Sequence, residues 1–149
     1  MATTDLEKAA YHEAGHAVVA WSFGVPVGGI YLDLQNESGH MDAPSPKHMD
    51  IDITRRIAFC LAGLRAEDAF APPGRPAKAA FDFGNVWEML RDNGTPKDTP
   101  EGKALRNQGR DCADKQLRKH AAKVRRVAER LLQPPHEIAR EQFEHLMQN

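Results

Sequence analysis

The stretch AYHEAGHAVVAW (residues 10–21) carries two histidines four residues apart, His12 and His16, with Glu13 directly after the first. The alanines and apolar residues between positions 4 and 23 predict one helix, which Gly24 ends. Residues four apart lie on one face of a helix, so the two imidazoles can bind the same metal ion. Zinc suits such a pair, because neutral imidazole nitrogens are among its ordinary ligands.

Glu13 lies next to His12 in the chain and cannot join the histidines as a ligand without strain. Its carboxylate can instead reach a zinc-bound water and act as general base while hydroxide attacks a peptide carbonyl. Zinc lowers the pKa of its water to about 7, which makes hydroxide available at neutral pH. The spacing therefore predicts a zinc peptidase, and the alternative is a surface helix with two solvated histidines. The small residues Ala14, Gly15 and Ala17 would let another element approach the site.

A catalytic zinc site needs a third protein ligand, and the sequence alone leaves it open. The stretch does not continue as HExxHxxGxxH, because Val19 and Ser22 occupy the Gly and His positions. Asp82 is one candidate, which an ordinary role as a helix cap would also explain. Glu88 is a second candidate and otherwise a solvated charge. His40 is a third candidate and otherwise a turn residue.

The chain has 149 residues, which suits one domain over residues 1–149. Alternating apolar residues predict a strand over residues 28–35 and a short return strand over residues 40–43. Helical patterns cover residues 50–70, 81–94 and 99–133, and a last helix would carry Ile138, Phe143 and Leu146. The Pro-rich stretch at residues 71–80 predicts an exposed, mobile loop. The expected fold class is mainly α (α+β), a helical zincin-type domain with one small sheet near the N-terminus.

The composition argues against a disulfide-rich protein, a membrane-spanning protein and a nucleic-acid-binding protein. The net charge is −1, and two cysteines are too few for a disulfide framework, which favours a reducing, cytoplasmic setting. No apolar run approaches the ~20 residues that a membrane-spanning helix needs. The stretch from Lys103 to Arg130 has ten basic against three acidic residues, so a nucleic-acid-binding helix is conceivable. A solvated helix face is the favoured interpretation, and nucleic acid is not an expected partner.

The order of these motifs resembles the peptidase domain of the FtsH-like family, the membrane-anchored AAA+ zinc proteases. YHEAGHAVVA (residues 11–20) is similar to the zinc helix of that family. ITRRIAFCLAGLRAED (residues 53–68) resembles its next helix, with Gly63, Ala66 and Glu67 matching a Gly-x-x-Ala-Glu core. FDFGNVWEMLR (residues 81–91) resembles the segment in which an Asp supplies the third ligand. The closing helical pair of the family is similar to residues 124–146.

The resemblance implies that His12, His16 and Asp82 bind zinc and that Glu13 is the catalytic carboxylate. It implies a zinc-dependent endopeptidase that hydrolyses peptides or unfolded protein segments by Glu-assisted attack of a zinc-bound water. The substrate would lie as an extended strand beside the small sheet, with Gly28 to Leu34 as the pairing edge. A separate ATPase or further copies of the chain are possible partners.

The chain departs from the family in three respects. It contains no GxxxxGK[ST] motif for an ATPase, and it has no membrane-spanning segment. Phe81 stands where the family usually has a small or polar residue. The Arg of the family's Gly-Gly-Arg motif is displaced by one position, with Leu64 followed by Arg65. The expectation is therefore a stand-alone peptidase domain. The alternative is a non-catalytic adaptor, or a module that binds nucleic acid or protein and retains a peptidase fold.

Overall fold

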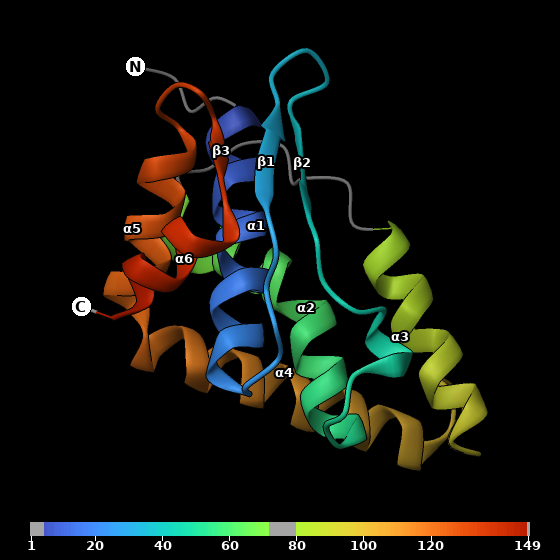
Figure 1. Cartoon of the computed structure of the whole chain (residues 1–149). Coiled ribbons are helices and arrows are strands. Elements are labelled where there is room, and N and C mark those ends of the chain that lie inside the picture. Colours follow the sequence, from blue (N-terminus) through green and yellow to red (C-terminus); the bar gives the residue numbers. More distant parts are fainter. Residues whose placement is uncertain (1–4, 72–79, 149) are drawn as a thin grey trace.

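A computed structural model describes residues 5–71 and 80–148 of the chain (Figure 1). In order, the elements are α1 (Asp5–Ser22), β1 (Ile30–Asp33), β2 (Ser38–Met41), the 3₁₀-helix η1 (Pro46–His48), α2 (Ile53–Phe70), α3 (Ala80–Asp92), α4 (Pro100–Lys119), α5 (Ala121–Leu131), β3 (Glu137–Ile138) and α6 (Arg140–Met147). The mainly helical α+β fold with a small sheet is thereby confirmed. The predicted Pro-rich loop lies almost wholly outside the described residues, and so does Thr4 at the expected helix start.

Helix α1 forms the centre of the molecule. It packs against α2, α5 and the sheet, and most of its residues from Lys8 to Ala20 are buried (Figure 1). At Gly15, a Cβ atom would lie 2.5 Å from the Cβ of Ala66 and 2.6 Å from the carbonyl oxygen of Ala62. Only glycine fits there, because both of those atoms are fixed parts of α2. The expectation that small residues admit a close neighbour is therefore confirmed.

The antiparallel sheet has the strand order β2-β1-β3, so β1 is its central strand. Ile30 pairs with Ile138 of β3 on one side, and Tyr31 pairs with His40 of β2 on the other. The predicted edge from Gly28 to Leu34 is therefore wrong, because neighbours on both sides already occupy its backbone groups. Strand β2 is an outer strand of the sheet, so its side away from β1 is a free edge. Leu34, which the sequence places within the strand, instead follows β1 in a turn and is 50% exposed.

The predicted helix over residues 99–133 begins as expected, because Thr99 caps α4 by accepting a hydrogen bond from the backbone N–H of Gly102. It does not run unbroken to residue 133. The chain leaves helical geometry at His120, and α4 packs mainly on α2 whereas α5 packs on α1. One straight helix could not pack on α2 and on α1 in this way, so the chain bends between α4 and α5. Apolar side chains are buried on both sides of the break, with Leu117 of α4 2% exposed and Val124 and Leu131 of α5 fully buried.

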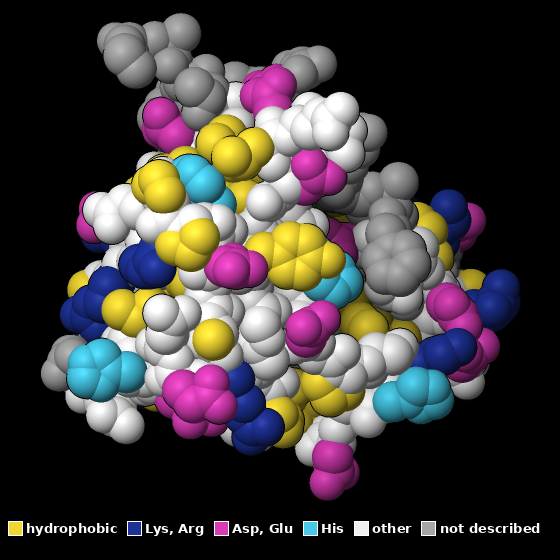
Figure 2. Space-filling model, turned by 45° about the horizontal axis from the view of Figure 1, so that its top comes forward, with side chains coloured by type: hydrophobic (Ala, Val, Ile, Leu, Met, Phe, Trp, Pro, Cys, Tyr) yellow, Lys and Arg dark blue, Asp and Glu magenta, His cyan; other side chains and the backbone are white. Residues whose placement is uncertain are grey.

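The last helix is shorter than predicted. Ile138 lies in β3 rather than in the helix, because its backbone pairs with β1 and its side chain fills the core at 1% exposure. Phe143 and Met147 then bury one side of α6. No described helix combines the length and apolar character required to cross a membrane. On the face seen in Figure 2, hydrophobic side chains are scattered among polar ones rather than joined into one apolar surface.

Candidate metal centre

Two helices bring three potential ligand atoms together. The Nε2 atoms of His12 and His16, one turn apart on α1, are 3.1 Å from each other. Oδ2 of Asp82, in the first turn of α3, lies 3.0 Å from Nε2 of His12 and 3.3 Å from Nε2 of His16. All three residues form a group that could hold a metal ion. Asp82 thus lies inside α3 rather than capping it.

The other ring nitrogen of each histidine contacts an acceptor on α2. Nδ1 of His12 lies 2.7 Å from Oε2 of Glu67, and Nδ1 of His16 lies 2.8 Å from the carbonyl oxygen of Phe59. Both acceptors require a hydrogen on Nδ1, which leaves the two Nε2 atoms facing Asp82. From the sequence, Glu67 was only part of the Gly-x-x-Ala-Glu stretch, with no role at the metal site. In the structure it is 1% exposed, and a carboxylate buried in this way needs a partner, which Nδ1 of His12 supplies.

Gly63 leaves the space beside both histidines open. A Cβ atom there would lie 2.5 Å from Nε2 of His12 and 2.6 Å from Nε2 of His16. Any other residue would therefore occupy the position next to the two ligand atoms. Gly63 thus packs directly against the two imidazoles.

The donor set fits zinc. Two atoms bound to a tetrahedral zinc ion at its usual distances are about 3.3–3.5 Å apart, and the three separations observed lie within a few tenths of an ångström of that. Two lone pairs and a carboxylate that face one another repel unless a cation lies between them. Two imidazoles and one carboxylate also match the ligand set of many catalytic zinc sites.

The pKa values of the ligands show how the metal-free protein balances this cluster. Burial lowers the pKa of His12, but hydrogen bonds with Asp82 and Glu67 outweigh it and raise the pKa from 6.5 to about 9. Burial likewise raises the pKa of Asp82, but the hydrogen bonds with His12 and His16 hold it well below its usual range. A proton on His12 therefore takes the place that a cation would fill.

One carboxylate oxygen of Glu13 has no hydrogen-bond partner among the described residues. The residue is only 7% exposed, and Oε2 is buried with no partner among the described residues. Its side chain packs on β2 at Gly39, where a Cβ atom would collide with Cγ of Glu13. A buried carboxylate oxygen without a donor is costly, which indicates a position reserved for a bound group.

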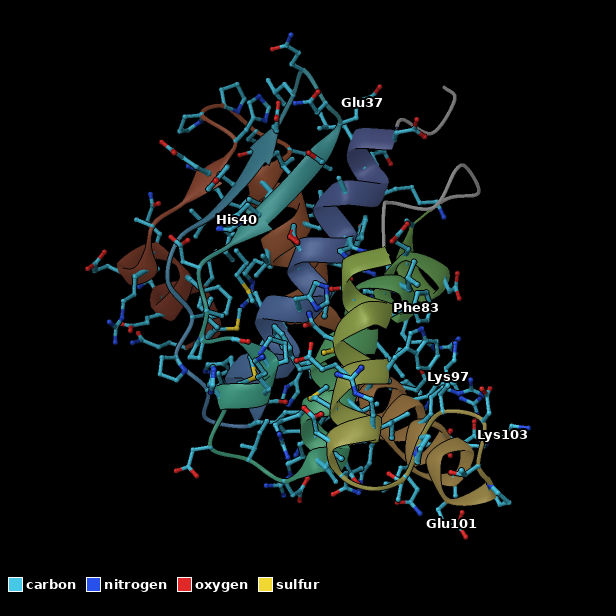
Figure 3. All side chains as sticks on the ribbon, turned by 90° about the vertical axis from the view of Figure 1, so that its right-hand side faces the viewer. Glu37, His40, Phe83, Lys97, Glu101 and Lys103 are labelled. Atoms are coloured by element: carbon cyan, nitrogen blue, oxygen red, sulfur yellow. The ribbon has the colours of Figure 1, made fainter. Side chains whose placement is uncertain are left out.

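The ligands and Glu13 open into one cleft of about 380 Å³ between β2 and α3. Figure 3 shows β2, with His40, on one side of α1 and α3, with Phe83, on the other. The residues that line the cleft are Ala9, His12, Glu13, His16, Ser38, Gly39, His40, Met41, Ala43, Pro44, Ser45, Pro46, Phe59, Asp82 and Asn85. A salt bridge of 3.0 Å between Lys47 and Glu88 connects η1 to α3 beside it.

The other candidate ligands lie elsewhere. Glu88 pairs with Lys47 instead of joining the histidines. His40 lines the cleft, but its Nε2 lies 3.0 Å from Oδ1 of Asp42 and its ring contacts Tyr31. Of the three, the structure brings only Asp82 to the histidine pair among the described residues.

The two cysteines and the two tryptophans lie outside the cleft and pack against other parts of the protein. Cys60 is buried, and burial raises the pKa of its thiol well above the ordinary value, as expected for an inert core residue. Cys112 is half-buried, and burial raises the pKa of this thiol as well. Trp87 stacks on Phe83 of α3, and Trp21 meets the ring of His120 edge-on. Neither tryptophan lines the cleft.

No protein-family model matches the chain, and comparison with curated proteins finds no match either.

Proposed function

We propose that this chain is a zinc-dependent endopeptidase that hydrolyses peptides or unfolded protein segments. The observation that carries the proposal is the convergence of two Nε2 atoms and one carboxylate oxygen within 3.3 Å of one another. Beside them lies Oε2 of Glu13, which has no hydrogen-bond partner in the described part of the chain. Three ligands leave one coordination position open, as catalytic zinc sites do. The resemblance to the FtsH-like peptidase domain agrees with this chemistry.

His12, His16 and Asp82 would hold the ion. Zinc in this position supplies the Lewis acidity that activates water and polarises a peptide carbonyl. Glu13 accepts the proton of the attacking water on its free Oε2 and delivers it to the leaving amine nitrogen. Glu67 and the carbonyl of Phe59 keep the two imidazoles in the required tautomer. The deep position of Glu13 limits competing contacts with bulk water.

The edge of β2 is the place where an extended substrate would pair. The N–H of Asp42 donates to Gly29 and its carbonyl accepts from Gly28, so both groups point towards β1. Backbone direction alternates along an antiparallel strand, so the backbone groups of Gly39 and Met41 point away from β1. Both residues line the cleft. Backbone pairing there would hold a polypeptide with little regard to its sequence.

Metal content and peptidase activity of the purified chain test the proposal together. After removal of metal with a chelator and addition of zinc, we expect one zinc ion per chain and cleavage of unfolded casein that returns with the metal. A chain that binds no zinc, cleaves nothing and binds DNA with salt-sensitive affinity would contradict the proposal and favour a non-catalytic nucleic-acid-binding module.

A further inference from the structure

Asn85 occupies the α3 side of the cleft with its side-chain amide available. It follows Asp82 by three residues, so both lie on the same face of α3. Both line the cleft, and Asn85 is partly buried. Asp82 is engaged by the two histidines, whereas the amide of Asn85 forms no hydrogen bond to any described residue.

The surroundings of Asn85 make a polar contact there effective. Much of the lining of the cleft is apolar, with Met41, Ala43 and Phe59 among the contributing residues. A hydrogen bond in such surroundings is stronger than in open water. A few polar groups among apolar lining residues are the usual arrangement by which a binding site orients its ligand.

A side-chain amide suits one partner in particular. It offers two N–H donors and one carbonyl acceptor, which together complement the C=O and N–H of a peptide unit. It carries no charge, so it does not select charged side chains. Gly39 and Met41 present backbone groups on the β2 side of the same cleft. An extended chain has a second row of backbone groups, which would face α3.

We propose that Asn85 is a substrate-binding residue whose amide pairs with the backbone of the bound polypeptide, on the side opposite β2. The inference rests on the proposed peptidase function and adds a second contact that recognises main chain rather than sequence. The substrate class that this predicts is extended, unfolded polypeptide of mixed sequence.

Binding and turnover are measured separately to test this. A fluorescein-labelled casein peptide is titrated into the zinc-loaded Glu13→Gln protein, with and without Asn85→Ala. We expect Asn85→Ala to weaken binding about tenfold, the effect of one or two net hydrogen bonds. In the otherwise wild-type protein, the same change should raise KM about tenfold and leave kcat within about twofold, the pattern of lost uniform binding. Asn107→Ala, an exposed amide on α4, is the matched control.

The outcomes separate the two proposals. Binding unchanged by Asn85→Ala, or weakened equally by Asn107→Ala, overturns the role of Asn85 while leaving the peptidase proposal intact. Asn85-dependent binding of a peptide that the wild-type protein never cleaves supports Asn85 and overturns the peptidase proposal. If the Glu13→Gln protein binds no peptide, the role of Asn85 is overturned as well.

Discussion

Each nitrogen of the two ligand imidazoles has a defined neighbour. The Nδ1 atoms meet Glu67 and the Phe59 carbonyl on α2, and the Nε2 atoms meet Asp82 on α3. These contacts fix the orientation of both rings before any ion binds, so little ordering of the side chains remains to be done on binding. The geometry of the cluster His12, His16 and Asp82 therefore depends on three helices, α1, α2 and α3.

Replacing Asp82 should test its role as the third ligand. Asp82→Asn removes the anionic oxygen that lies closest to both histidines, and we expect zinc affinity to fall by more than about 100-fold, since groups that only orient ligands are worth roughly 10–100-fold. Glu88→Gln removes an exposed salt bridge to Lys47 and should change zinc affinity by less than about twofold. Competition with a chromogenic chelator measures both. The reverse order would assign the third ligand to Glu88.

The raised pKa of His12 predicts that the metal-free protein loses stability in alkaline solution. A pKa of about 9 in the folded state exceeds the ordinary 6.5 of the unfolded chain, so the folded state binds more protons between these values. The contribution is complete below pH 6.5 and is lost as pH rises through 9. Asp82, with its depressed pKa, contributes above its ordinary value of 3.8 and stops contributing in strong acid.

Urea unfolding in the presence of a chelator measures this dependence. Between pH 6 and pH 9 we expect the free energy of unfolding to fall by on the order of 2 kcal/mol, from a pKa difference of between two and three units. The Asp82→Asn protein lacks the main hydrogen-bond partner and should show a smaller fall. A wild-type stability that is constant or rises over this range would exclude a protonated His12 in the folded, metal-free cluster.

Among the elements, the contact between α1 and α2 matters most for the site, because α1 carries two ligands and α2 carries the groups that orient them. Gly15→Ala would place a methyl group 2.5 Å from Ala66 Cβ, so the helices must separate. We expect a loss of about 1–3 kcal/mol, typical of overpacking, and weaker zinc binding. Gly84→Ala on α3 meets nothing within 4 Å and should stabilise by about 0.5–1 kcal/mol through helix propensity. Equal effects of the two changes in chemical denaturation would refute the packing argument.

The elements that sequence could predict are those with local signals. Thr99 with Pro100 marks the start of α4, and Gly94, in a left-handed conformation, follows α3 as expected. The break at His120 has no Gly or Pro to mark it, because it arises from packing on two different helices. Likewise, β3 is two residues long and exists through pairing with β1 far away in the chain. Contacts between segments that are distant in the chain leave no periodic pattern of apolar residues in the local sequence.

For the whole molecule, the cleft joins residues that are distant in the chain. The spacing of His12, Glu13 and His16 is local, so the two potential ligands and the nearby carboxylate could be recognised from sequence. Asp82 lies 70 residues from His12 and was one of three open candidates until the resemblance favoured it. Glu67 stood in the Gly-x-x-Ala-Glu stretch without an assigned role, and Asn85 belonged to no motif of its own. Only the tertiary arrangement brings the two residues to the site.

The central claim is that Glu13 performs chemistry beside a zinc ion, and the cleavage rate of unfolded casein by zinc-loaded wild-type and Glu13→Gln proteins tests it most directly. The substitution keeps the size of the side chain and removes its ability to take a proton, so zinc content should stay at one per chain. We expect the rate to fall at least about 100-fold, the usual contribution of a general base. A Glu13→Gln protein that retains zinc and cleaves casein at the wild-type rate would contradict the account.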